Sequence, residues 1–205
     1  MLIKTIPVGH LGTNCYVVTN EQTLESVVID PGDEGNAILD YLESNKLKCL
    51  AIMLTHGHYD HVGAVSYVAE ETGAVVYMNK RDDRRHAPEG SYLTYELPEN
   101  GISYDDGDVI ELAGLRFYIM ATPGHTPGGV TIRCEDALFT GDTLFRGSCG
   151  RVDFPGGSID EELRSLRYIC SLEGDYEVYP GHMDSSTLER ERRFNHYCRE
   201  AMAKF

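Results

Sequence analysis

Four potential metal ligands lie close together in the segment "THGHYDHVG", at His56, His58, Asp60 and His61. Imidazole and carboxylate groups suit zinc, and they also bind iron and manganese. In a locally extended chain, His56 and His58 point to the same side. Asp60 and His61 fall at the start of a predicted helix and can point to a neighbouring spot. One loop can therefore offer two ligands to each of two adjacent metal ions.

Two ligands are too few for one metal ion, so other parts of the chain must contribute. Three later positions qualify: His125 in "TPGHTPGG", Asp142 in "FTGDTLF" and His182 in "YPGH". Glycine beside each of them lets the backbone bend sharply and bring the side chain close. The chain thus offers seven candidate ligands, five histidines and two aspartates. The other histidines are interpreted as surface residues: His10, His86 and His196.

The elements around the first cluster place it on a loop. The apolar run 49–54 predicts a buried strand, and the apolar spacing from Asp60 to Gly73 predicts one helix. The cluster lies between them, on a strand-to-helix loop of the kind that often carries binding sites in α/β folds.

The rest of the chain alternates strand and helix patterns. About twelve segments read as strands, more than one sheet holds comfortably. The predicted fold is therefore α/β, with two mixed sheets packed face to face and helices on the outer faces. Hairpins are expected to turn at 113–114 and at 135–136, and residues 79–100 read as irregular with room for one helix. Helices are expected at 35–46, 160–171 and 187–198, and the last strand near 176–182.

Composition narrows the class of protein. The chain has 205 residues, and its formal net charge of −15 disfavours nucleic acid and anionic membranes as partners. Its start lacks the pattern of a signal peptide, and no window is apolar enough for a membrane span. The six cysteines show no CxxC spacing, which is typical of free thiols. We expect one domain over residues 1–205 of a cytoplasmic protein; the oligomeric state is left open.

The motifs together resemble a known family. "VVIDPG", "THGHYDHVG", "TPGHTPGG", "FTGDTLF" and "PGH" resemble, in order, the motifs of the metallo-β-lactamase superfamily. The resemblance extends over nearly the whole chain, and "GDTLFRGSCGRVDFPGG" is most similar to the short glyoxalase II-like (hydroxyacylglutathione hydrolase-like) enzymes. It implies an αββα sandwich with a dinuclear metal site at one edge of the sheets.

The same resemblance implies a role for each ligand. The first metal ion would take His56, His58 and His125, and the second Asp60, His61 and His182, with Asp142 bridging both. The two ions are expected to be divalent, with Zn²⁺ favoured and Fe or Mn possible alternatives. Asp30 of "VVIDPG" would hold the other ring nitrogen of a ligating histidine.

The implied activity is metal-dependent hydrolysis of a small thioester. Two divalent ions can hold a hydroxide between them at neutral pH, and one can polarise the substrate carbonyl while the hydroxide attacks. Asp60 is also interpreted as a catalytic residue that orients this hydroxide. The expected partner is a small-molecule thioester of a hydroxyacyl group.

Some positions depart from the glyoxalase II pattern. No C-terminal helical domain that grips glutathione is expected here, and Met183-Asp184 stands where the family has Glu-Tyr. Arg151 matches the basic residue that the family places beside glutathione, so it is predicted to bind substrate. Asp153 stands where an aromatic residue is usual. Another small thiol or a different acyl ester is therefore open as the substrate.

The motifs are also compatible with other functions of the superfamily. A single-iron persulfide dioxygenase, using His56, His125 and Asp142, is the principal alternative, because motifs separate it weakly from the hydrolases. A β-lactamase is disfavoured by Asp142 and by the absence of a signal-peptide pattern. A nuclease is disfavoured by the acidic charge, and a non-enzymatic binding module by the intact set of seven ligands.

Overall fold

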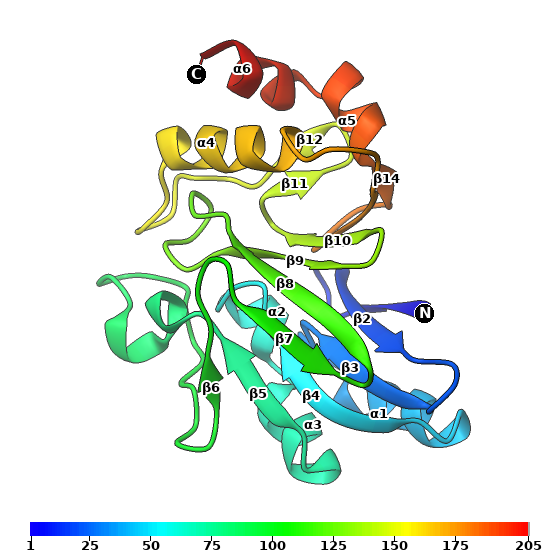
Figure 1. Cartoon of the computed structure of the whole chain (residues 1–205). Helices are drawn as coiled ribbons and strands as arrows, with labels where there is room; N and C mark the ends of the chain where they lie inside the picture. Colours follow the sequence, from blue (N-terminus) through cyan, green and yellow to red (C-terminus); the bar gives the residue numbers. More distant parts are fainter. Residues whose placement is uncertain (205) are drawn as a thin grey trace.

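The computed structural model describes residues 1–204 of the chain. Two six-stranded sheets pack face to face, and helices cover the outer face of each sheet (Figure 1). This is the αββα sandwich of the α/β class that the sequence predicts.

The first sheet is mixed and has the spatial order β1-β2-β3-β4-β5-β6. The first three strands pair antiparallel, and the last four pair parallel. Its strands have these bounds: β1 Leu2–Val8, β2 Thr13–Thr19, β3 Glu25–Ile29, β4 Lys48–Met53, β5 Val75–Met78 and β6 Ile102–Ser103.

The second sheet is also mixed, with the order β14-β13-β10-β9-β8-β7. Only β10 and β13 pair parallel in it. Its strands have these bounds: β7 Val109–Leu112, β8 Leu115–Ala121, β9 Val130–Cys134, β10 Ala137–Gly141, β13 Glu177–Pro180 and β14 Ser186–Thr187. A separate short hairpin, which the sequence did not predict, joins β11 Leu144–Phe145 to β12 Ser148–Cys149.

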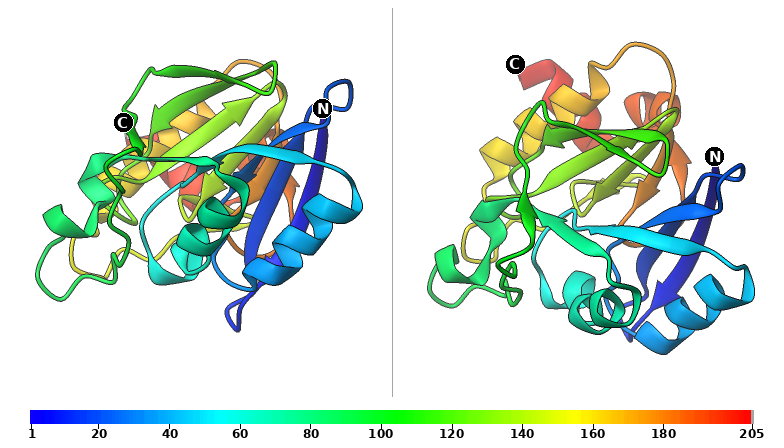
Figure 2. Two further views of the ribbon diagram at one scale, coloured as in Figure 1. Left: turned by 90° about the horizontal axis from the view of Figure 1, so that it is seen from below. Right: turned by 60° about the horizontal axis from the view of Figure 1, so that its bottom comes forward.

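Helices lie on both outer faces, as Figure 2 also shows. The first sheet packs against α1 and α3, and the second against α4, which α6 covers in turn. The helices have these bounds: α1 Gly35–Ser44, α2 Tyr59–Val62, α3 Val65–Thr72, α4 Ile159–Cys170, α5 Leu188–Phe194 and α6 His196–Lys204. Two 3₁₀ helices, η1 Lys80–Asp82 and η2 Arg84–His86, lie in the segment predicted to be irregular.

The layers explain why the central strands are apolar on both faces. In β3, Val27 and Ile29 face the other sheet, whereas Val28 packs beneath the helices of the first sheet. All three side chains are fully buried. A strand covered on both faces reads as a continuous apolar run rather than an alternating one, and this gives the chain three hydrophobic layers.

The predicted hairpin turn at 113–114 is confirmed. Ala113 and Gly114 both have positive φ angles, 55° and 69°, as a two-residue turn with the twist of the flanking strands requires. The turn at Glu135 also has a positive φ, 51°, and joins β9 to β10.

The single helix predicted from Asp60 to Gly73 is wrong. The structure has two helices there, α2 and α3, separated at Gly63 and Ala64. The segment that carries Pro31 and Gly32 packs into the break. The backbone N–H of Ala64 donates to the Pro31 carbonyl at 3.0 Å, and a Cβ on Gly63 would lie 2.3 Å from the Gly32 carbonyl oxygen. A tertiary contact therefore interrupts a locally helical pattern.

The helix predicted over 187–198 is likewise divided. Asn195 is fully buried between α5 and α6 in an extended conformation. Its side-chain amide donates to the carbonyls of Phe145 and Ser148, and its side-chain oxygen accepts from the N–H of Tyr197. Hydrogen bonds to the β11–β12 hairpin thus hold Asn195 out of the helix that it would otherwise continue.

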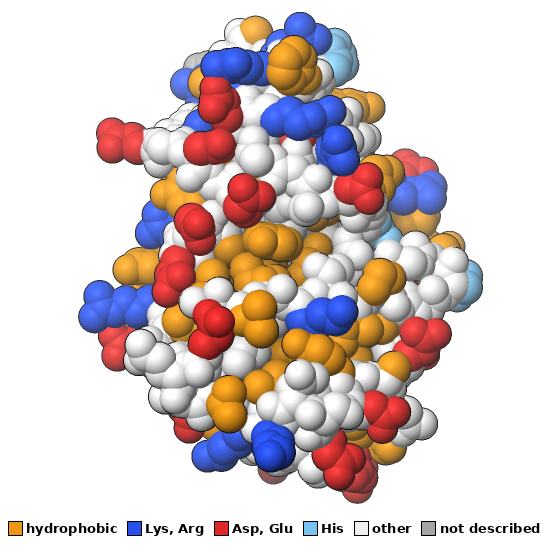
Figure 3. Space-filling model, turned by 90° about the vertical axis from the view of Figure 1, so that its right-hand side faces the viewer, with side chains coloured by type: hydrophobic (Ala, Val, Ile, Leu, Met, Phe, Trp, Pro, Cys, Tyr) orange, Lys and Arg blue, Asp and Glu red, His pale blue; other side chains and the backbone are white. Residues whose placement is uncertain are grey.

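The surface mixes charge and hydrophobic groups. On the face shown in Figure 3, acidic and basic side chains are interspersed around hydrophobic side chains near its middle. Within residues 1–204, the structure contains no helix with both the length and the apolar character needed to cross a bilayer.

Helix α4 carries a buried carboxyl group beneath one of the candidate ligands. Ser158 caps the helix by accepting from the N–H of Glu161, and Glu162 on the next position is fully buried. Neither carboxyl oxygen of Glu162 has a well-formed hydrogen bond. Burial raises the pKa of Glu162 to about 9, and the opposing effect of the backbone N–H of His125 is smaller.

This carboxyl should make the stability of the fold depend on pH. The pKa of Glu162 is higher in the folded chain than in the unfolded one, so between about pH 4.5 and 9 the unfolded chain binds fewer protons. Stability should therefore fall as pH rises through this window. Glu162→Gln should flatten that slope and stabilise the protein at pH 8–9 by on the order of 1–3 kcal/mol, measured by urea unfolding. Glu161→Gln, at the exposed neighbour, is the control. An equally steep pH slope in both variants and the parent would contradict the assignment.

Candidate metal centre

Seven candidate ligands predicted from the sequence meet at one edge of the sandwich. His56 and His58 follow β4, and Asp60 and His61 belong to α2. His125 lies in the loop between β8 and β9. Asp142 follows β10, and His182 follows β13. The site is therefore built from loops of both sheets, and the packing of one sheet on the other brings them together.

The first group consists of His56, His58 and His125. One ring nitrogen of each lies within 4.8 Å of the others, and all three residues are buried. His58 Nδ1 and His125 Nε2 are 2.9 Å apart. Three imidazoles that converge on one point are a suitable set for a divalent metal ion.

The second group consists of Asp60, His61 and His182, whose ligand atoms also lie within 4.8 Å of one another. Asp60 Oδ2 is 3.6 Å from His61 Nε2 and 3.2 Å from His182 Nε2. This group combines two imidazoles with one carboxylate, again a donor set that suits divalent cations.

Asp142 lies between the two groups. Its Oδ1 is 3.4 Å from His61 Nε2, and its Oδ2 is 3.4 Å from His125 Nε2 and 3.5 Å from His182 Nε2. Gly181 makes this approach possible, because a Cβ there would lie 2.2 Å from Asp142 Oδ1. One carboxylate thus reaches both groups of imidazoles.

Unpartnered buried atoms test whether the cluster fits a metal. Within the described residues, His56 Nε2, His61 Nε2 and Asp142 Oδ1 are buried without hydrogen-bond partners. Such atoms cost free energy unless something satisfies them. Each belongs to a candidate ligand and lies among the others, so the His/Asp cluster fits a divalent metal.

The protonation of the first group also favours metal ligation. Burial lowers the pKa of His56 well below its usual value, and burial, followed by the nearby His125, lowers that of His58 to about 3. Both imidazoles are therefore neutral at physiological pH, the form in which histidine binds metals. For Asp142, burial favours the neutral form, but the adjacent His61, His182 and His56 together outweigh it and hold the pKa well below the usual range.

Asp30 orients the loop that carries these histidines. Its Oδ2 lies 2.9 Å from His61 Nδ1, and its two oxygens accept from the Thr55 N–H at 2.7 Å and the Thr55 hydroxyl at 2.5 Å. Asp30 is also near His56 and His61 in a third cluster. Because its oxygens already have partners, its geometry suits a residue that orients His61 rather than a metal ligand.

Asp82, which the sequence analysis missed, holds the loops of the first group. It is fully buried and accepts from the N–H of Gly57 at 3.0 Å, the N–H of Gly128 at 2.6 Å and the hydroxyl of Thr126 at 2.7 Å. Gly57 separates the two histidines of the first loop, and Thr126 follows the third. One carboxylate therefore ties two distant loops together.

Asn14 and Thr13 act in a similar way on the second group. The Asn14 amide donates to the carbonyls of Pro180 and Met183 at 3.0 and 2.9 Å, and its backbone N–H donates to Gly181 at 2.7 Å. These contacts enclose the turn that carries His182. Thr13 donates to Asp60 Oδ2 at 3.1 Å.

The sequence hints at a role for Asn14 but not at one for Asp82. Asn14 is a polar residue inside an apolar strand, which is itself a hint that its amide is needed. Asp82 lies in the charged run "KRDDRR", where an aspartate reads as solvated. Its burial arises only when η1 packs against two loops that are far away in the sequence.

A cavity of about 500 Å³ opens onto the ligands. Arg151 lines it, as expected, but its Nε and Nη2 both donate to Asp153, each at 2.7 Å. The backbone carbonyl of Arg151 lies 2.7 Å from His125 Nδ1 and so orients that ring. The side chain of Arg151 as a substrate contact stays a prediction.

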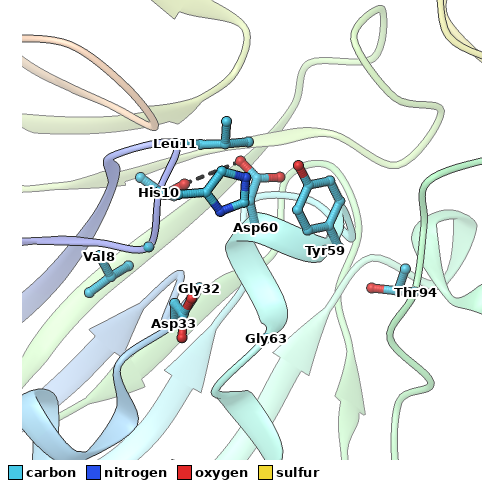
Figure 4. Close-up of a pocket in the computed structure, with 11 residues that line it drawn as sticks. Val8, His10, Leu11, Gly32, Asp33, Tyr59, Asp60, Gly63 and Thr94 are labelled. Atoms are coloured by element: carbon cyan, nitrogen blue, oxygen red, sulfur yellow. Dashed lines mark hydrogen bonds between the residues drawn. The ribbon is translucent and has the colours of Figure 1, made fainter.

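A second cavity, of about 390 Å³, lies beside Asp60 (Figure 4). Leu11, Tyr59 and Asp60 line both cavities and separate them. His10 is exposed at the rim of this second cavity, consistent with its interpretation as a surface residue.

Fold and site together define a metallo-hydrolase type of protein. The family model described as "Metallo-beta-lactamase superfamily" matches residues 8–182. The chain belongs to this superfamily, which includes metal-dependent hydrolases.

A relative and three solved structures show which proteins the chain is similar to. Hydroxyacylglutathione hydrolase GloC of Haemophilus influenzae is 30% identical, over 95% of this chain and 97% of that protein. The structure of BLEG-1 B3 metallo-beta-lactamase has a TM-score of 0.87 and 32% identity, covering 96% of this chain and 99% of its own. The structure of ETHE1 from Myxococcus xanthus has a TM-score of 0.82 and 27% identity, covering 96% of this chain and 84% of its own. The structure of TTHA1623 in a di-iron-bound form has a TM-score of 0.79 and 33% identity, covering 95% of this chain and 99% of its own.

Asp82 should be needed for metal binding although it faces no metal. Asp82→Ala leaves two backbone N–H groups and a hydroxyl without their acceptor, so the loops of the first group should loosen. We expect metal affinity to fall by about 10- to 100-fold, measured by titration with Zn²⁺. Asp83→Ala is the matched control, because the neighbouring Asp83 is also buried but accepts from Arg85 and Leu97. Equal loss of metal affinity in both variants would indicate general destabilisation.

Asn14 should affect metal binding through the turn that carries His182. Asn14→Ala removes two hydrogen bonds to that turn, and we expect a loss of about 10-fold or more in metal affinity in the same titration. Asn20→Ala provides the control. Asn20 lies just beyond the other end of β2 and also donates to a carbonyl linked to the second sheet, that of Ala113, at 2.8 Å. Unchanged metal binding in Asn14→Ala would contradict the positioning role.

Proposed function

We propose that this protein is a dinuclear metal-dependent hydrolase that cleaves small thioesters, similar to hydroxyacylglutathione hydrolases. The observation that carries the proposal is the position of Asp142: its Oδ2 faces His125 of the first group and His182 of the second, and its Oδ1 faces His61 of the second. A carboxylate placed in this way can bridge two cations. The relationship to GloC supports the reaction class.

The residues present would hold two divalent cations, and we propose that both are Zn²⁺. His56, His58 and His125 would hold one, Asp60, His61 and His182 the other, and Asp142 both. When bound, such cations lower the pKa of water and polarise a carbonyl group. Burial lowers the pKa values of His56 and His58, so neither imidazole is a strong base for this reaction.

The protein's own residues orient the reactants. Thr13 holds one oxygen of Asp60, which keeps that carboxylate in a single orientation at the floor of the cavity. Asp60 can then accept a hydrogen bond from the attacking water and direct it towards the thioester carbonyl. Tyr92 and Phe154, whose rings are 4.6 Å apart, form an aromatic wall of the same cavity. That wall can bind the acyl or thiol portion and exclude bulk water.

Replacing Asp142 tests the bridging role and the activity together. Asp142→Ala should reduce the metal content from about two ions per chain to at most one, and thioester hydrolysis by more than about 100-fold. Elemental analysis and assays with S-lactoyl and S-acetyl thioesters of several small thiols measure both quantities. Asp184→Ala is the control, because exposed Asp184 pairs only with Arg146 near the cavity rim in the contacts observed here. Equal metal content in Asp142→Ala and the parent would contradict the bridging role.

The same experiment separates the hydrolase from the alternative dioxygenase. A parent protein that contains one iron per chain, consumes oxygen with a persulfide and hydrolyses none of the thioesters would replace the proposed function by the iron enzyme. That enzyme would need only His56, His125 and Asp142 of the set.

A further inference from the structure

The cavity over the ligand cluster has one permanently charged cation among its described lining residues. Among the described residues that line it, Arg151 is the only lysine or arginine. Much of the remaining wall is apolar or aromatic: Leu11, Tyr92, Phe145, Phe154 and Met183. Whether the positive charge of Arg151 is free or paired therefore has a strong influence on which substrates this cavity accepts.

Asp153 occupies the binding face of Arg151. Two parallel hydrogen bonds, Nε to Oδ1 and Nη2 to Oδ2, both 2.7 Å long, join the guanidinium to the carboxylate. This is the bidentate geometry with which arginine would otherwise bind a substrate carboxylate. The contact lowers the pKa of Asp153 to about 2, so the carboxylate is ionised at neutral pH.

Phe154 keeps the guanidinium in this position. The Arg151 Cζ atom lies 3.9 Å from the centroid of the Phe154 ring, a cation–π contact. The same ring lies 5.9 Å from the His58 ring and 4.6 Å from Tyr92. Arg151 is therefore stacked on the aromatic wall and paired with an internal anion, and the pair carries no net charge.

We infer that Asp153 is a specificity-determining residue, which cancels the charge of Arg151 and selects uncharged, apolar thioesters over those of anionic thiols such as glutathione. This inference rests on the proposed thioesterase function and names its substrate class. The net charge of −15 acts in the same direction, because it disfavours the approach of anions. Both side chains are more than half exposed, so solvent weakens the pairing and the selection should be moderate.

Four proteins test the inference: the parent, Asp153→Asn, Arg151→Gln, and the double variant. For each, kcat/KM is measured with S-lactoylglutathione, which is anionic, and with S-lactoyl-N-acetylcysteamine, which is uncharged. The ratio of the two values is the readout, so the neutral ester is an internal reference. Metal content is measured in all four, because the Arg151 backbone contacts His125.

Charge cancellation predicts a definite order of these ratios. Asp153→Asn should raise the preference for the anionic ester by about 2- to 5-fold, and Arg151→Gln should lower it by a similar factor. The double variant, again without net charge, should resemble the parent. If Arg151 instead grips the substrate carboxylate in the parent, the double variant should fall about 5- to 150-fold below it, which would overturn the inference. An unchanged ratio in Asp153→Asn would overturn it as well.

A binding measurement keeps this test separate from the proposed function. Calorimetric titration compares S-methylglutathione with S-methyl-N-acetylcysteamine, neither of which can be hydrolysed as a thioester. The metal-loaded parent should bind the neutral compound more tightly, and Asp153→Asn should narrow the difference. If no thioester is hydrolysed but this binding pattern holds, the thioesterase function fails and the charge selection stands. Tighter binding of the anionic compound by the parent would reject the selection.

Discussion

The convergence of several imidazoles and two carboxylates in a mostly buried cluster is the constraint on which much of this structure depends. Buried polar groups without partners are costly, and His56, His61 and Asp142 each present such an atom to the others. The cluster is therefore stable only if the backbone around it is held firmly. The chain meets this requirement with hydrogen bonds from outside the cluster rather than with regular secondary structure.

Three polar side chains provide that support: one follows β3, one lies in η1 and one lies in β2. Asp30 binds Thr55 and His61, Asp82 joins the loop of His58 to that of His125, and Asn14 encloses the turn of His182. All three side chains are buried, and each has two or more hydrogen bonds. Asp82 and Asn14 also connect segments from the two sheets. The metal cluster and the sandwich are thus linked: the packing of the sheets positions the ligands, and the same contacts hold the sheets together at that edge.

The cavity wall differs in polarity from the cluster of ligands beneath it. The cluster concentrates charge, whereas the wall above it is aromatic, and its one basic side chain is neutralised by a neighbour two residues away. A thioester has an uncharged reacting group, so such a wall is compatible with the proposed reaction. In this chain, Arg151 and Asp153 together set the charge that the wall presents.

The sequence by itself determined the layered α/β fold and the seven residues that the structure brings together. The reason is that both rest on local patterns: apolar runs define buried strands, and histidine or aspartate beside glycine marks the turns at strand ends. Only the tertiary structure decided the breaks in the helices at Gly63 and Asn195, the burial of Asp82 and the engagement of Arg151 by Asp153. The helix breaks and the burial of Asp82 depend on a partner distant in sequence. The Arg151–Asp153 pair joins residues only two apart, but stacking on Phe154 sets the orientation of the guanidinium. Spacing along the chain carries no information about such contacts.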